Sequence, residues 1–160
     1  MEIRNIRNQY DLQSRLFNNV MKEVTDENAL KRLSDNTNNF AWIAAHTLDL
    51  QYNIAMMTGI ATENPYAEHF SFGKPFDPDI EFPTMNSLLN DWNGLTPKIQ
   101  TALAELNEEQ LNGELPFPIP FAEQTLKGFL AFQMHHLGYE IGQLGLLRKY
   151  LGYDAMSYQL

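Results

Sequence analysis

Apolar residues recur at helical spacing in four long segments of the chain. Within each segment they stand three or four positions apart, which gathers them on one side of an α-helix. The four segments cover about residues 3–24, 38–57, 84–106 and 122–151. Gly59 is a natural end signal for the second segment, and Thr84 is a natural cap for the third. Because no segment carries a strand pattern, we predict an all-α fold: one domain, residues 1–160, built as a four-helix bundle.

The connections between the predicted helices are rich in turn-forming residues. Asp26 is predicted to cap a short turn after the first helix. Residues 60–83 contain four prolines and are predicted to form a long loop. Residues 115–121, LPFPIPF, alternate proline with apolar residues, which forces an extended chain. We interpret this stretch as a stiff connection laid across the bundle; a polyproline ligand for a partner domain is the alternative.

The charge balance and the absence of cysteine limit the partners and the chemistry. The sequence has 20 acidic and 11 basic residues, a formal net charge of −9. Binding a polyanion relies on Lys and Arg, so this balance argues against nucleic acid and against an anionic membrane surface. The lack of cysteine excludes disulfides, thiolate ligands and a cysteine nucleophile. Residues 1–13 lack the apolar core of a signal peptide, and no apolar run is long enough to span a membrane, so a cytoplasmic location is expected.

Three residues of metal-binding types lie at the edges of the apolar stripes. His136 and Glu140 are four positions apart on the last predicted helix, so their side chains share one face. His46 lies at the edge of the stripe on the second predicted helix. Two imidazoles and a carboxylate that face into a bundle have the composition of a divalent-metal site, for Zn, Ni, Fe or Mn. The alternative is a set of ordinary polar residues at the edge of the core, or a hydrogen-bonded His–Glu pair.

Other residues near these candidates have weaker claims to a role. His135 is rotated away from the apolar stripe and is expected to be exposed, and His69 is expected to be a solvated loop residue. Asp49 is three positions after His46. It would either orient an imidazole or occupy a solvated helix position. Gln143 follows Glu140 closely, and the sequence leaves its role open between packing and function.

Two stretches resemble a known family. HHLGYEIGQLGLLRKYLG, residues 135–152, resembles the last-helix signature of the DinB-like (YfiT-like) metalloenzyme superfamily. The positions that match this signature are His136, Gly142, Gln143, Leu147, Arg148, Leu151 and Gly152. FAWIAAHTLDLQ, residues 40–51, resembles the family's second helix, whose histidine corresponds to His46. The resemblance implies the four-helix bundle and a divalent metal held at one end of it.

The sequence departs from the family pattern at one metal-ligand position. Where the family commonly has its third histidine, this chain has Glu140. Two outcomes follow from the chemistry of a carboxylate. In the first, Glu140 is a direct ligand in a two-His, one-carboxylate triad with an altered metal preference. Alternatively the site has decayed, and Glu140 bonds to a neighbouring group, because a buried carboxylate needs a partner.

The resemblance implies a metal-dependent enzyme acting on a small molecule. Relatives include transferases that use low-molecular-weight thiols, such as bacillithiol or mycothiol, and some hydrolases and isomerases. A thiol S-transferase would suit a chain without cysteine, since the thiol comes from the cosubstrate. The alternative function is a catalytically inactive bundle that acts as a small-ligand-binding or dimeric structural module. The family resemblance also implies a homodimer, to which a face of Gly138, Gly142 and Gly145 on the last helix could contribute; the same face could equally pack within the monomer.

Overall fold

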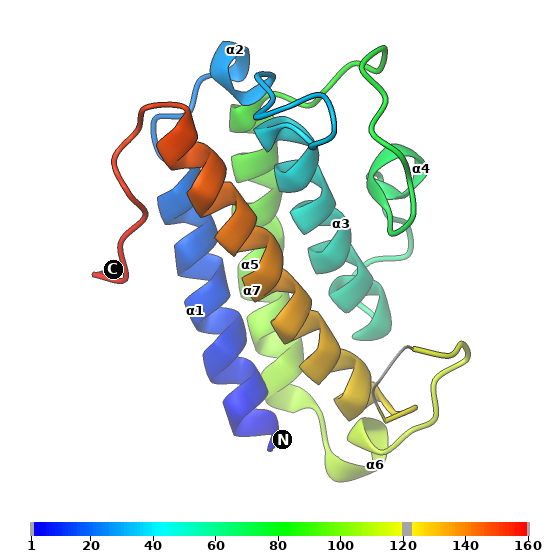
Figure 1. Cartoon of the computed structure of the whole chain (residues 1–160). Coiled ribbons are helices and arrows are strands. Elements are labelled where there is room, and N and C mark those ends of the chain that lie inside the picture. The colour runs from blue at the N-terminus through cyan, green and yellow to red at the C-terminus, as the bar shows by residue number, and fades with distance from the viewer. Residues whose placement is uncertain (1, 120–122, 160) are drawn as a thin grey trace.

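The computed structural model describes residues 2–119 and 123–159, and all regular elements in these ranges are helical (Figure 1). Four long helices run side by side: α1 (Ile3–Met21), α3 (Phe40–Met57), α5 (Met85–Glu105) and α7 (Leu126–Tyr150). Three single-turn helices lie in the connections: α2 (Asp26–Ala29), α4 (Ala67–Phe70) and α6 (Glu108–Leu111). The predicted all-α four-helix bundle is therefore confirmed.

Local capping explains where the long helices begin. The Thr84 side chain accepts a hydrogen bond from the Ser87 N–H at 3.1 Å, so the predicted cap of α5 is confirmed. Thr125 caps α7 in the same way through the Gly128 N–H at 3.1 Å, so α7 begins later than predicted. The predicted start of this helix, at residue 122, lies outside the described residues.

Two expectations about the first connection are wrong in detail. α1 ends at Met21, three residues early, because Glu23 adopts a positive φ of 66° that no α-helix accommodates. The cap of α2 is Thr25, whose hydroxyl accepts from the Asn28 N–H, and Asp26 lies inside the turn. The Asp26 carboxylate instead accepts from the Met85 N–H at 2.6 Å and so fastens this turn to the start of α5.

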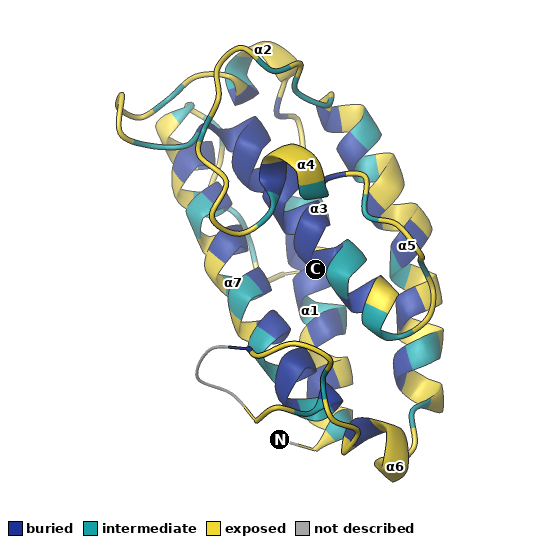
Figure 2. Cartoon of the chain, turned by 90° about the vertical axis from the view of Figure 1, so that its right-hand side faces the viewer, coloured by how far each residue is buried: buried dark blue, intermediate teal, exposed yellow. Residues whose placement is uncertain are grey.

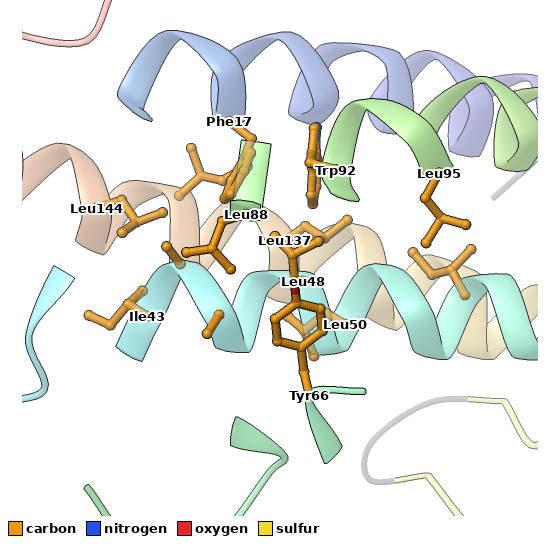
Figure 3. Close-up of a cluster of buried hydrophobic side chains, with 14 of the residues drawn as sticks. Phe17, Ile43, Leu48, Leu50, Tyr66, Leu88, Trp92, Leu95, Leu137 and Leu144 are labelled. Carbon is orange, nitrogen blue, oxygen red and sulfur yellow. The ribbon is translucent and has the colours of Figure 1, made fainter. Parts of the chain in front are cut away.

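The core lies between the four long helices. α3 and α1 do not face each other through a large contact; each packs on both α5 and α7. Figure 3 shows large apolar side chains from all four helices converging there, among them Phe17, Leu48, Trp92 and Leu137. The Phe17 and Trp92 rings stack with their centroids 4.1 Å apart. The most buried helix is α3, in which every residue from 40 to 51 is buried (Figure 2).

The segment between α3 and α5 folds back over the bundle. α4 lies beside α3 (Figure 1), with Phe70 buried. The Tyr66 hydroxyl donates to the Asp91 carboxylate at 2.6 Å and ties this segment to α5. The predicted long loop is thus largely irregular, as expected, but it contains α4 and covers the outer side of α3. That cover brings the Phe70 carbonyl and the Ser71 hydroxyl next to α3.

The end of α7 is fastened by a buried arginine. Arg148 is 4% exposed, and its guanidinium donates to main-chain carbonyls of Val20 at 3.1 Å, Lys22, and Asp154 at 2.6 Å. Two of these carbonyls belong to the C-terminal end of α1, where intrahelical donors run out and a positive charge is favourable. Arg148 is one of the positions that resemble the family signature, and the structure gives it this packing role.

Candidate metal centre

His46, His136 and Glu140 converge on one point between α3 and α7. The Nε2 atoms of the two histidines are 3.5 Å apart. Glu140 Oε1 lies 3.3 Å from His136 Nε2 and 3.9 Å from His46 Nε2. One donor atom from each of the three residues thus falls within 4.8 Å of the other two. The helical spacing of His136 and Glu140 places both on the face of α7 that meets α3, as the sequence predicted.

The His46 ring is held in one orientation. It stacks on the Trp42 ring, with centroids 5.2 Å apart, and its Nδ1 lies 2.5 Å from the Phe70 carbonyl oxygen. A carbonyl oxygen only accepts, so Nδ1 carries a proton, and in the neutral imidazole the Nε2 lone pair then faces the other two residues. This arrangement, with a main-chain carbonyl behind a ligating imidazole, is typical of metal sites.

Glu140 has one carboxylate oxygen for the site and one for its own helix. Oε2 accepts a hydrogen bond from Gln143 Nε2 at 2.6 Å, while Oε1 faces the two histidines. The side chains of His46 and Glu140 are only 5% and 6% exposed, and that of His136 is 16% exposed. The centre is therefore nearly closed to solvent, and His136 forms its open side.

The three donors fit a divalent metal ion. Ligand distances of about 2.0–2.2 Å in a tetrahedral site place neighbouring ligand atoms about 3.4 Å apart. The observed separations of 3.3, 3.5 and 3.9 Å are close to that spacing. Two neutral nitrogens and one anionic oxygen suit Zn, Ni, Fe or Mn. Three protein ligands also leave a coordination position for a small molecule.

A cavity of about 360 Å³ begins at His136 and extends along the bundle surface. α3 and α7 form its two long walls, and residues 71–72 and 117–119 form the rest. Phe129 and Phe132 on α7 and Met57 on α3 make its surface largely apolar. A small molecule in this cavity would lie directly against the open side of the centre.

The remaining sequence candidates lie outside the triad. His135 is exposed, as expected. His69 is also exposed and pairs with Glu68 at 3.8 Å. Gln143, which the sequence left open, binds the Glu140 carboxylate.

The expectation of a solvated position for Asp49 is wrong, because its side chain is buried, and its carboxylate does not contact an imidazole directly. Oδ1 accepts from Ser71 Oγ at 2.7 Å and from Asn64 Nδ2 at 2.8 Å, and Oδ2 accepts from Asn53 Nδ2 at 3.2 Å. Asp49 therefore holds the α4 segment from both sides, through Asn64 before α4 and Ser71 after it. The Phe70 carbonyl carried by that segment has no counterpart in the sequence analysis, because any residue type supplies a main-chain carbonyl.

The fold and the site together define an all-α bundle with a candidate His–His–carboxylate metal centre. The family model of the DinB superfamily matches residues 9–144, which include all three candidate ligands. The chain belongs to the DinB superfamily. Among curated proteins, none matches the sequence. In the part of the chain that the structure describes, no helix has both the length and the apolar character needed to cross a membrane.

Proposed function

We propose that the protein is a metal-dependent enzyme whose metal is held by His46, His136 and Glu140. The observation that carries this proposal is the convergence of three donor atoms, nearly closed to solvent, beside a cavity of about 360 Å³. A bound divalent metal would lower the pKa of a coordinated water or thiol and so provide a nucleophile at neutral pH. The three protein residues would fix the position of the metal, and the surrounding side chains would exclude bulk water from the centre.

Each of the three residues has a distinct part in this proposal. His46 is held with its Nε2 lone pair toward the centre by the Phe70 carbonyl. Glu140 supplies the negative charge, and Gln143 holds its second oxygen away from the centre. His136 lines the cavity, so a substrate there would meet the metal on that side.

The reaction class proposed is S-transfer with a low-molecular-weight thiol, or hydrolysis, on a small-molecule substrate. Membership of the DinB superfamily supports this class, and a chain without cysteine must take any thiol from its cosubstrate. The donor set suits Zn, Ni, Fe or Mn. A cytoplasmic location stays a prediction of the sequence.

A second candidate function is a catalytically inactive, small-ligand-binding bundle. One observation favours it: the Glu140 carboxylate already accepts a hydrogen bond from Gln143 at 2.6 Å and lies 3.3 Å from His136 Nε2, so it has polar neighbours without a metal. In this case the cavity would bind a ligand and the triad would only join α3 to α7.

Metal analysis of protein made without a histidine tag separates the two functions. The protein is loaded with Zn, Ni, Mn or anaerobic Fe(II), dialysed and analysed for bound metal. We expect about one metal per chain in the parent, and a loss in His46→Ala, His136→Ala and Glu140→Gln. His135→Ala is the matched control, because it removes an exposed histidine next to His136 and should leave the metal content unchanged.

Two results would contradict the metal proposal. In the first, the parent protein retains none of the four metals. In the second, the parent retains a metal whose content the three triad variants leave unchanged. If the metal is lost in the histidine variants but kept in Glu140→Gln, the triad is reduced to its two imidazoles. The low-molecular-weight-thiol and hydrolase activities would be assayed only with a loaded parent.

A further inference from the structure

The cavity beside His136 has an apolar rim that solvent reaches. Met56 on α3, Phe72 after α4 and Phe117 before α7 line the cavity and are 41%, 85% and 43% exposed. Large apolar side chains that gather around one hollow and face water commonly mark a binding site. The cavity volume of about 360 Å³ lies within the range of small-ligand pockets. The rim therefore points to a ligand that is held through apolar surface.

Inward from this rim, half-buried side chains continue the apolar surface toward the candidate centre. Phe132 on α7 and Met57 on α3 belong to the two long walls of the cavity. The centroid of the Phe132 ring lies 5.8 Å from that of the His136 ring. A ligand that covers the rim and Phe132 therefore reaches the open side of the candidate centre.

The charged and polar groups of the cavity wall do not favour an anion. Among the described residues that line it there is neither lysine nor arginine. The Asp49 carboxylate lies in the wall, where it is 1% exposed, and accepts hydrogen bonds from the partly exposed Ser71 and Asn53. Because no basic side chain of the wall balances the charge of Asp49, an anionic ligand would be repelled and would find no cationic partner.

We propose that the cavity binds a compact, uncharged apolar molecule, held by Phe72, Phe117 and Phe132. Its inner end lies against His136, on the open side of the candidate centre. That this molecule is the substrate of the metal centre rests on the proposed function; that the cavity binds it does not.

Three probes separate charge from apolar character. 2-Naphthylmethanol is uncharged and apolar, 2-naphthoate carries the same rings with a negative charge, and methyl glucoside is uncharged but hydrophilic. Binding to chelator-treated protein is followed by two-dimensional NMR titration, because a carboxylate would otherwise be free to bind a metal directly. We expect 2-naphthylmethanol to bind about tenfold more tightly than 2-naphthoate, since the described walls offer a carboxylate no basic partner. Methyl glucoside should cause no shifts in the cavity.

The exposed positions of the rim allow the cavity to be changed without disturbing the core. Phe72→Ala and Phe117→Ala should each weaken the binding of 2-naphthylmethanol about threefold through lost apolar contact. Met56→Lys places a basic group at the rim and should remove or reverse the preference over 2-naphthoate. Tyr158→Ala is the control, because this residue is 71% exposed and does not line the cavity; the binding of both naphthalene probes should be unchanged.

The inference is overturned if 2-naphthylmethanol does not bind, if 2-naphthoate or methyl glucoside binds the parent as tightly, or if the shifts lie outside the cavity. Unchanged preference in Met56→Lys would also overturn it, as would unchanged binding in both Phe72→Ala and Phe117→Ala. In the last case, a fall in the sedimenting mass of these two variants would assign the rim to a contact between two copies of the chain.

All arms use metal-free protein, so their outcome is independent of the metal analysis. A protein that binds 2-naphthylmethanol but no metal refutes the proposed function alone. A protein that binds metal but not this probe refutes the present inference alone.

Discussion

The imidazole of His46 is fixed by the carbonyl of Phe70, and the segment that carries this carbonyl is fixed by Asp49. Ser71 follows Phe70 directly, and its hydroxyl donates to the Asp49 carboxylate at 2.7 Å. Asp49 thus acts on the candidate centre through two intermediate residues, Ser71 and Phe70. It is a positioning residue rather than a ligand, and its effect on metal affinity should exceed its effect on the fold.

We expect Asp49→Asn to lower metal affinity about tenfold, within the range of changes to groups behind metal ligands. The change removes the charged acceptor of three hydrogen bonds and loosens the segment that carries the Phe70 carbonyl. Competition titration with a chelator measures the affinity, and ¹⁵N spectra of the His46 ring report whether Nδ1 still carries the proton. Asp79→Asn, at an exposed position, is the control. Unchanged affinity and ring spectra in Asp49→Asn would contradict this role.

The three candidate ligands could be predicted from the sequence, but the groups behind them could not. His136 and Glu140 are recognisable as a pair because a spacing of four places two side chains on one helical face. The burial of Asp49 could not be predicted, because Asn64 and Ser71, on either side of α4, reach it only when the segment between α3 and α5 folds back over the bundle. The spacing of apolar residues along the sequence gives no information about this contact between the loop segment and α3.

At the scale of elements, the start of a helix could be predicted where a capping residue marks it in the sequence. The Thr84 side chain caps α5 because its hydroxyl reaches an unbonded N–H within the same turn. Burial of α3 was harder to foresee. Periodicity assumes one covered face, whereas α3 is covered by α5 and α7 on one side and by the α4 segment on the other.

A polar contact joins three of the four long helices inside the core. Gln51 of α3 donates through Nε2 to the Tyr10 hydroxyl of α1 at 3.0 Å and to Thr96 Oγ1 of α5 at 3.0 Å. Burial raises the pKa of Tyr10 to about 12. The unfolded chain would release this proton near pH 10, while the folded protein keeps it to about pH 12. The free energy of unfolding should therefore fall as pH rises from about 10 to 12, by up to about 1.4 kcal/mol per pH unit from this group.

Replacing Tyr10 by Phe should separate two effects. At pH 7 the variant loses the hydrogen bond from Gln51, which should lower the free energy of unfolding by about 1 kcal/mol. Between pH 10 and 12 the variant should lose less stability than the parent, because it has no proton to release. Urea denaturation at several pH values measures both, with Tyr158→Phe at an exposed position as the control. If the free energy of unfolding fell equally with pH in the parent and in Tyr10→Phe, the raised pKa of Tyr10 would be contradicted.

At the scale of the whole molecule, the outer face of α7 supports the proposed homodimer. Tyr139, Leu146 and Tyr150 are 60%, 63% and 51% exposed there, and a side chain added at Gly142 would meet nothing within 4 Å. Gly138 has a different role, because a Cβ at that position would lie 3.0 Å from the Gln13 side chain of α1. The glycine face predicted from the sequence is thus divided between packing inside the monomer and open surface.

We expect sedimentation velocity to give the mass of a dimer for the parent and of a monomer for Leu146→Lys, which places a charge in this apolar face. Lys74→Leu, a change at an exposed residue between α4 and α5, should leave the mass unchanged. A monomeric parent at all concentrations would contradict the homodimer, and it would leave the metal proposal untouched because all three ligands belong to one chain.

We propose above all that one divalent metal is bound by both histidines and the carboxylate. The most direct measurement is a crystal structure of the loaded protein with anomalous diffraction at the absorption edge of the metal. We predict one strong anomalous peak, about 2.0–2.2 Å from Nε2 of His46, Nε2 of His136 and Oε1 of Glu140. An anomalous peak at His69 or His135, or loaded crystals in which Glu140 bonds to His136 with no peak between them, would contradict it.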